Sequence, residues 1–223
     1  MKVFQKADGG VLQSGRDYDI GTSTNIGEGQ VVALSEGLVI AAIQKQTGKI
    51  LGIAAENHSG SADALNTRND GPKIQIWDAP DAIFQCPAPV VAATGGSATT
   101  VTASTLGAFS NDDFNGGYLK LVEKAANSTN TDPVGKVYRI TDYAYNSTGT
   151  VSTFTKASGG APSAGDKYAV FPPVGFTKGQ FDSGKTKLDL TDTCTLAMKV
   201  VGRDEDAETV LMMANLHVLG VEE

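Results

Sequence analysis

The stretch GEGQVVALSEGLVIAAIQKQTGKILGIAAE, residues 27–56, decides the fold class of this chain. Polar, glycine-bearing turns at 35–37 and 44–49 divide it into three short runs rich in β-branched residues: Val31–Leu34, Leu38–Ile43 and Ile50–Ala55. Short runs of this kind between such turns predict strands rather than a buried helix. A sheet this small needs further strands from elsewhere in the chain to bury its face.

The overall composition agrees with many short strands joined by turns. The chain has 223 residues, of which 26 are glycine and 40% are hydrophobic, enough for a core. Its net charge of −7 argues against electrostatic binding to nucleic acid or to anionic membranes. No apolar run reaches membrane-spanning length, and the opening residues MKVFQKADGG lack the apolar core of a signal peptide. We therefore expect synthesis in a cytoplasm.

The two cysteines, Cys86 and Cys194, both lie within apolar strand patterns. Without a secretion signal, this placement favours two buried free thiols over a disulfide.

Proline pairs and charge balance divide the chain. Residues 90–172 lie between Pro87-Ala88-Pro89 and Pro172-Pro173, and hold six acidic and six basic side chains, so the flanking residues carry all of the net charge. Four alternating strand patterns occur inside this segment: Tyr118–Val122, Val137–Thr141, Val151–Thr155 and Tyr168–Phe171. This pattern predicts a small β-domain, 90–172, inserted into a discontinuous domain made of residues 27–89 and 173–223.

Residues 1–26 have a different character from the rest. Glycines interrupt every pattern, and the apolar positions fall at three places: Val3–Phe4, Val11–Leu12 and Tyr18–Ile20. We interpret this segment as an N-terminal arm and expect it to lie along a partner.

The C-terminal part offers the strands that the opening stretch lacks. Residues 187–200, KLDLTDTCTLAMKV, alternate with period two and predict one strand with a buried face and a solvated face. Asp192 interrupts the apolar face and predicts a bulge or an edge. The run at 208–221 is apolar on both faces, which predicts a central strand.

Two further runs, Ile74–Trp77 and Ala82–Cys86, flank the turn Asp78-Ala79-Pro80-Asp81 and predict a hairpin. We expect residues 27–86 and 174–221 to form one sheet system.

Residues able to carry chemistry are few. His58 and His217 lie in separate segments, no zinc-binding spacing occurs, and there is no G-x-S-x-G element. The run Asn111–Gly116, NDDFNG, imitates the start of an EF-hand loop, but its twelfth position is Val122, so an Asn- and Asp-rich turn is the better interpretation. We predict no enzyme, no catalytic or metal-binding residue and no cofactor.

Several motifs resemble a known family. GQVVALSEGLVIAA at 29–42, KILGIAAEN at 49–57 and KIQIWDAPDAIFQCPA at 73–88 resemble the head decoration, or cement, proteins of tailed bacteriophages. Within the proposed insert, the runs NDDFNGGYLKLV, GKVYRITDY, GTVSTFT and SAGDKYAVFPP resemble small β-modules of phage virion proteins.

The resemblance implies an all-β fold, a discontinuous small β-barrel or sandwich (β-tulip-like) with an inserted β-domain. It also implies a structural virion protein on the capsid surface. Its partners would be the major capsid protein and further copies of itself, in a trimer or a dimer. We expect it to bind neither nucleic acid nor membrane. The family supplies no motif residues that can be carried over as a binding site.

Two other functions stay open from the sequence. An adhesin of the head fibre or tail would use 90–172 as a carbohydrate-binding module. Its candidate sugar-contacting residues are four tyrosines: Tyr118, Tyr143, Tyr145 and Tyr168. Packing in the core or across strands is the simpler role for these tyrosines. A hydrolase would need a histidine or carboxylate pair brought together in a pocket, for which the sequence gives no indication.

Overall fold

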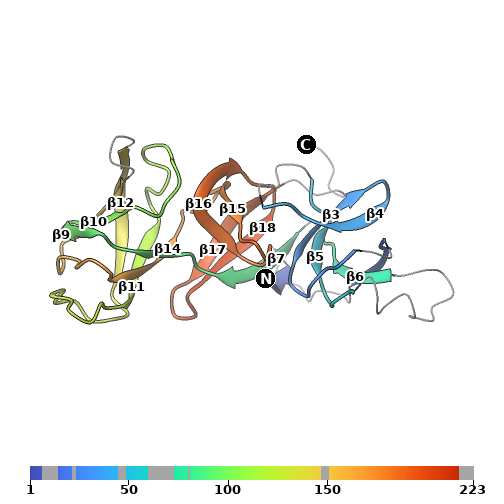
Figure 1. Cartoon of the computed structure of the whole chain (residues 1–223), viewed down its shortest axis with the longest axis horizontal. Helices are drawn as coiled ribbons and strands as arrows, with labels where there is room; N and C mark the ends of the chain where they lie inside the picture. The colour runs from blue at the N-terminus through green and yellow to red at the C-terminus, as the bar shows by residue number, and fades with distance from the viewer. Residues whose placement is uncertain are drawn as a thin grey trace.

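The computed structural model describes residues 1–6, 15–21, 24–44, 49–59, 73–79, 81–146 and 151–215, with the backbone alone at 2–6 and 151. These residues form strands and turns and contain no helix, so the predicted all-β class is confirmed. It follows that no helix within these ranges could span a membrane. The strands form three groups along the long axis: β9–β14 at one end, β15–β18 with β7 in the middle, and β3–β6 at the other end (Figure 1).

The stretch 27–56 lies in a five-stranded antiparallel sheet, here called the end sheet. Its strand order is β2-β6-β5-β3-β4, and a single parallel bridge from Ile20 to Val39 brings its two outer strands together. The aliphatic core of this sheet is fully buried: Ile20, Ile26, Val32, Val39, Leu51, Ala54, Ile74 and Ile76. The strand bounds are β2 Arg16–Asp19, β3 Val31–Ser35, β4 Leu38–Ala41, β5 Gly52–Ala54 and β6 Lys73–Trp77.

A four-stranded central sheet has the order β1-β7-β18-β17. Its strands are β1 Lys2–Lys6, β7 Ala82–Pro87, β17 Met198–Asp204 and β18 Thr209–Ala214. β18 pairs on both sides, which confirms a central strand within the predicted run 208–221; residues 216–221 lie outside the described part.

The predicted hairpin between Ile74–Trp77 and Ala82–Cys86 is wrong. β6 pairs with β2 and β5 in the end sheet, whereas β7 pairs with β1 and β18 in the central sheet. The chain leaves the end sheet at Asp78, a buried carboxylate that accepts a hydrogen bond from the Tyr18 hydroxyl and pairs with Arg16 at 3.5 Å. The polar turn therefore joins two sheets instead of closing a hairpin.

The single strand predicted over 187–200 is two strands. β16, Leu188–Thr195, forms a hairpin with β15, Lys178–Phe181, and the chain breaks at Leu196 before β17 begins. The pairing steps from Gly179–Cys194 to Gln180–Asp189, so residues 190–193 bulge out of the ladder. This confirms the irregularity predicted at Asp192.

The sheet system predicted for 27–86 and 174–221 needs the same correction. The C-terminal strands pair with β7 and not with β3–β5, so the two parts of this domain meet through loops and packing. Val31 N donates to Lys185 O at 3.0 Å, and Phe181 N donates to Gln44 O at 2.7 Å. Val31, Ile50 and Ile53 also share a hydrophobic core with strands of the central sheet.

The arm also differs from its prediction. Lys2–Lys6 pairs with β7 and Arg16–Asp19 pairs with β6, so its described segments complete sheets of their own chain rather than lying along a partner. Both β7 and β6 would otherwise be outer strands, and the arm covers their edges. The anchor at Val11–Leu12 lies outside the described residues.

Residues 90–172, here called the inserted module, contain a seven-stranded sheet of order β8-β14-β11-β12-β13-β10-β9. Among the described residues, these strands pair only with one another. The four strands predicted in this segment are present, and three short ones add to them. Its strands are β8 Val90–Ala92, β9 Gly95–Ser97, β10 Thr100–Ala103, β11 Tyr118–Glu123, β12 Val137–Asn146, β13 Val151–Lys156 and β14 Lys167–Phe171.

The inserted module has an aromatic core. The ring of Phe114 lies 4.7–5.4 Å, centroid to centroid, from four other rings: Phe109, Tyr143, Phe154 and Phe176. Phe176 follows the module in sequence, so this cluster also fixes the module to the rest of the chain.

The two cysteines are thiols and form no disulfide, as predicted. Cys86 is buried, and burial raises the pKa of its thiol. Cys194 is only half-buried, since it lies beside the bulge in β16.

Candidate binding surface

The hairpin of β3 and β4 shapes one end of the molecule. Ser35 pairs with Leu38 across a two-residue loop in which Glu36 and Gly37 have φ of 52° and 84°. Positive φ at both central residues is the geometry of a type I′ turn, whose twist matches that of the strands it joins. The hairpin is therefore tight, and its register is fixed by the turn.

Apolar side chains lie on the outer face of this hairpin. Val39 is fully buried, whereas its neighbours Leu38 and Ile40 are 42% and 37% exposed, because successive side chains of a strand point to opposite faces. Ile43, just beyond β4, is 63% exposed. We call these exposed side chains, Leu38 and Ile40 on the hairpin together with Ile43 just beyond it, the apolar face. Single exposed apolar residues are ordinary, but three that are close in sequence at one hairpin mark a candidate contact surface.

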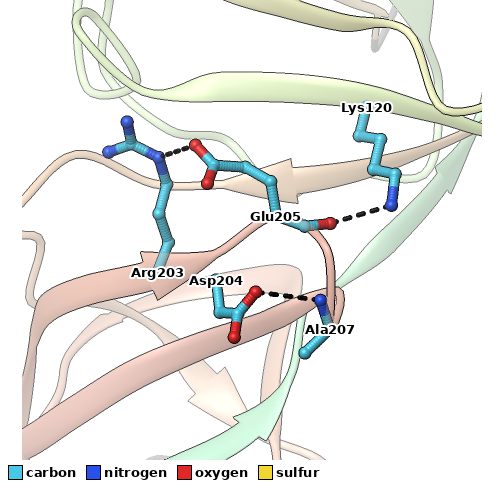
Figure 2. A network of polar contacts seen from close by, with 5 residues as sticks. All are labelled: Lys120, Arg203, Asp204, Glu205 and Ala207. Carbon is cyan, nitrogen blue, oxygen red and sulfur yellow. Dashed lines mark hydrogen bonds and ion pairs between the residues drawn. The ribbon is translucent and has the colours of Figure 1, made fainter.

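At the opposite side of the central sheet, polar contacts hold the inserted module in place. The guanidinium of Arg203 on β17 lies 3.7 Å from the ring centroid of Tyr118 on β11, and its Nε donates to Glu205 at 2.6 Å. Lys120 Nζ donates to the carbonyl of Glu205 at 2.8 Å (Figure 2). The same amine pairs with Glu208 at 2.9 Å. These contacts, here called the clamp, join the module to the tip of the β17–β18 hairpin.

A buried polar network stabilises the loops of the inserted module. Asp166 is fully buried and accepts hydrogen bonds from Ala125 N, Ser163 N, the Ser128 hydroxyl and the Asn130 amide, at 2.9–3.2 Å. Burial raises the pKa of Asp166, but these hydrogen bonds outweigh it and hold that pKa below its ordinary value. The carboxylate acts as an acceptor that orders four donors.

Lys156 is the one buried amine of the module's described part. Its Nζ donates to Ala98 O at 2.9 Å and Gly160 O at 3.3 Å, and it lies 4.3 Å from the ring centroid of Tyr138. Desolvation lowers the pKa of Lys156. Because it ties two loops by their carbonyl groups, its role is structural.

The residues singled out from sequence do not come together as a chemical site. His58 is buried, and its backbone pairs with Ile26 at 2.8–3.0 Å; His217 lies outside the described residues. Across the described ranges, no three histidine, cysteine or acidic side chains gather as a metal site would require.

The run Asn111–Gly116 forms a turn closed by its own side chains. Asn115 donates to Asp112 at 2.8 Å, Ser110 N donates to Asp113 at 2.8 Å, and Lys178 pairs with Asp113 at 2.6 Å. Asp112 has φ of 71°, which aspartate tolerates in turns. These contacts favour the predicted Asn- and Asp-rich turn over a calcium loop.

The four candidate tyrosines of the adhesin hypothesis are placed unequally. Tyr143 and Tyr168 are fully buried in the module core. Tyr118 is half-buried beneath Arg203, and Tyr145 is half-buried on β12. The sequence did not predict the clamp, since Tyr118 and Arg203 lie far apart in the chain and no local pattern relates them.

Comparisons with known proteins add no relative. No protein-family model, no curated protein and no solved structure matches this chain.

Proposed function

We propose that this chain is a structural virion protein that binds the outer surface of a bacteriophage capsid and stabilises contacts between capsomers. The motifs at 29–57 and 73–88 support it by their resemblance to capsid decoration proteins. The structural observation that carries it is the apolar face on the end sheet, at the end of the molecule away from the inserted module (Figure 1). The major capsid protein is the partner of this face, and the chain acts as a homo-oligomer, with a trimer favoured and a dimer as the alternative.

The arrangement suits a protein attached at one end. Leu38, Ile40 and Ile43 give up exposed apolar surface when a partner covers them, at about 25 cal/mol for each Å² removed from water. Many copies on a repeating lattice reinforce contacts that are individually weak, provided that the copies are linked. The clamp and the aromatic core hold the inserted module so that it projects from the attached end.

Co-sedimentation with capsids tests this proposal. Purified chain is mixed with expanded capsids that lack it, and the pellet is assayed for bound protein. The unaltered chain should saturate the capsids. The double variant Leu38→Lys with Ile40→Lys should lose about tenfold or more in affinity, since each lysine places a charge in the apolar contact.

A matched control uses exposed valines elsewhere. Val134 in the inserted module and Val174 after it are 55% and 67% exposed, so Val134→Lys with Val174→Lys adds the same charge away from the apolar face. This control should bind like the unaltered chain. Absence of the unaltered chain from the pellet at saturating concentration would overturn the proposal.

A further inference from the structure

A groove lies where the inserted module meets the β15–β16 hairpin. It encloses about 570 Å³, within the size range of ligand sites. One wall is apolar and contains the segment from Pro87 to Val91, and Leu106 also lines the groove. The other wall is polar and contains Asp182 and Asp189 of the hairpin.

The apolar wall contains an unpaired sheet edge. β8 is an outer strand of the seven-stranded sheet, and among the described residues it pairs with β14 alone. Val170 N donates to Pro89 O and Ala93 N donates to Asp166 O, so alternate residues of this ladder turn their main chain toward β14. Val90 and Ala92 therefore present their N–H and C=O groups at the outer edge. The Val90 side chain is 53% exposed.

The groove is open because the chain that follows β10 turns away from β8. Thr94 N still donates to Thr102 O at 2.8 Å, but beyond this point the chain after β10 is held by the bulge of β16, where Gly107 N donates to Leu190 O at 2.9 Å. A Cβ at Gly107 would lie 2.8 Å from Asp192 Cα, so this close approach requires glycine. The bulge thus keeps residues 105–106 apart from β8.

The polar wall is negatively charged. Asp182 accepts hydrogen bonds from the backbone N–H of Thr186 and Lys187, and Asp189 accepts from Thr191 N and the Gln180 amide. All of these donors are neutral, and within the described part of the chain neither carboxylate forms an ion pair. Lys187 at the groove supplies one positive charge against these two, and the amino group of Met1, which donates to Thr186 O at 2.7 Å and whose pKa is lowered by burial, lies near Asp182.

We propose that this groove binds an extended, basic peptide segment of a partner protein, which adds as a strand to the outer edge of β8. Main-chain hydrogen bonds to Val90 and Ala92 supply the pairing, in the mode of β-strand addition. Apolar side chains of the peptide cover Val90 and Leu106, and its lysine or arginine side chains face Asp182 and Asp189. Pro87 and Pro89 have no N–H, so pairing is confined to the short edge from Val90 onward. This inference is independent of capsid binding.

Model peptides test the proposal on the full chain. The probe is a capped hexapeptide of alternating lysine and valine, followed by fluorescence anisotropy. It should bind, and should slow hydrogen exchange at the amides of Val90 and Ala92. Two control peptides, one with glutamate in place of lysine and one with proline in place of the central valine, should bind about tenfold more weakly.

Protein variants separate pairing from charge. Val90→Pro removes an N–H that the sheet itself does not use, so the chain should stay folded and lose about tenfold in affinity, whereas Val90→Thr keeps the N–H and should bind normally. Asp189→Asn should weaken the salt dependence of binding. Equal binding of the lysine and glutamate peptides, or unchanged binding by a folded Val90→Pro variant, would overturn the proposal.

Discussion

The end sheet and the inserted module are both built from short antiparallel strands, but their interiors differ. The end sheet buries aliphatic side chains such as Val32, Leu51 and Ile74, and exposes Leu38 and Ile40 on its outer face. The inserted module buries a set of aromatic rings together with a polar network centred on Asp166. We infer that the module is built for rigidity and the end sheet for contact.

The largest expected effect lies in the aromatic core. Phe114→Ala removes a ring that contacts four others and should lower the free energy of unfolding by about 3–5 kcal/mol. Urea denaturation measures this change. Phe114→Leu, which keeps most of the volume, serves as the control and should lose less. A loss below about 1 kcal/mol for the alanine variant would show that the site collapses and that the cluster is not the centre of the core.

The polar network should be nearly as sensitive. Asp166→Ala leaves several buried donors without their acceptor, at a cost of about 3 kcal/mol, the upper end for a buried polar group left unsatisfied. Asp142 is exposed on β12, and Asp142→Ala should change stability by no more than about 0.5 kcal/mol. Thermal unfolding of both variants makes the comparison, and equal stability would refute the role given to Asp166.

Acid should destabilise the module through the same carboxylate. The pKa of Asp166 is lowered in the folded chain, so its contribution to stability is full above the ordinary aspartate pKa of about 3.9 and is lost as pH falls through the lower folded value. Carboxylates titrate roughly between pH 6 and pH 2. Over this range, the free energy of unfolding should therefore fall more steeply for the unaltered chain than for Asp166→Asn. Identical slopes would contradict this assignment.

The clamp should contribute less than either core. Arg203→Ala removes the stacking on Tyr118 and the ion pair with Glu205, and should cost about 1–2 kcal/mol. Arg203→Lys keeps the charge but not the planar stacking, so its stability should lie between those of the alanine variant and the unaltered chain. If the lysine variant were as unstable as the alanine variant, stacking would account for the whole effect and the ion pair for none.

Much of this division could be predicted from sequence, because strand periodicity and turn residues are local signals. The alternation at Tyr118–Val122 and the Ser35–Gly37 turn each predicted their elements. The pairing partner of each strand could not be predicted in this way, because no local signal in β6 or β7 indicates that they enter different sheets. The clamp and the groove were not predicted for the same reason, since each joins residues that are distant in the chain and that no local pattern relates.

The smallest expected effect on stability belongs to the apolar face. Leu38→Lys with Ile40→Lys replaces exposed side chains and should change the free energy of unfolding by no more than about 0.5 kcal/mol at each site. Urea denaturation measures this, with Val39→Lys as the contrasting variant, since Val39 is buried and should not tolerate a charge. A large loss for the Leu38 and Ile40 variant would show that the face is part of the core.

Electron microscopy of expanded capsids with and without the bound chain tests the proposed orientation directly. We expect additional density on the outer surface of the capsid. The molecule should fit this density with the end sheet, and its residues Leu38 and Ile40, against the capsid and with the inserted module pointing outward. Density that places the inserted module against the capsid and the end sheet in solvent would contradict it.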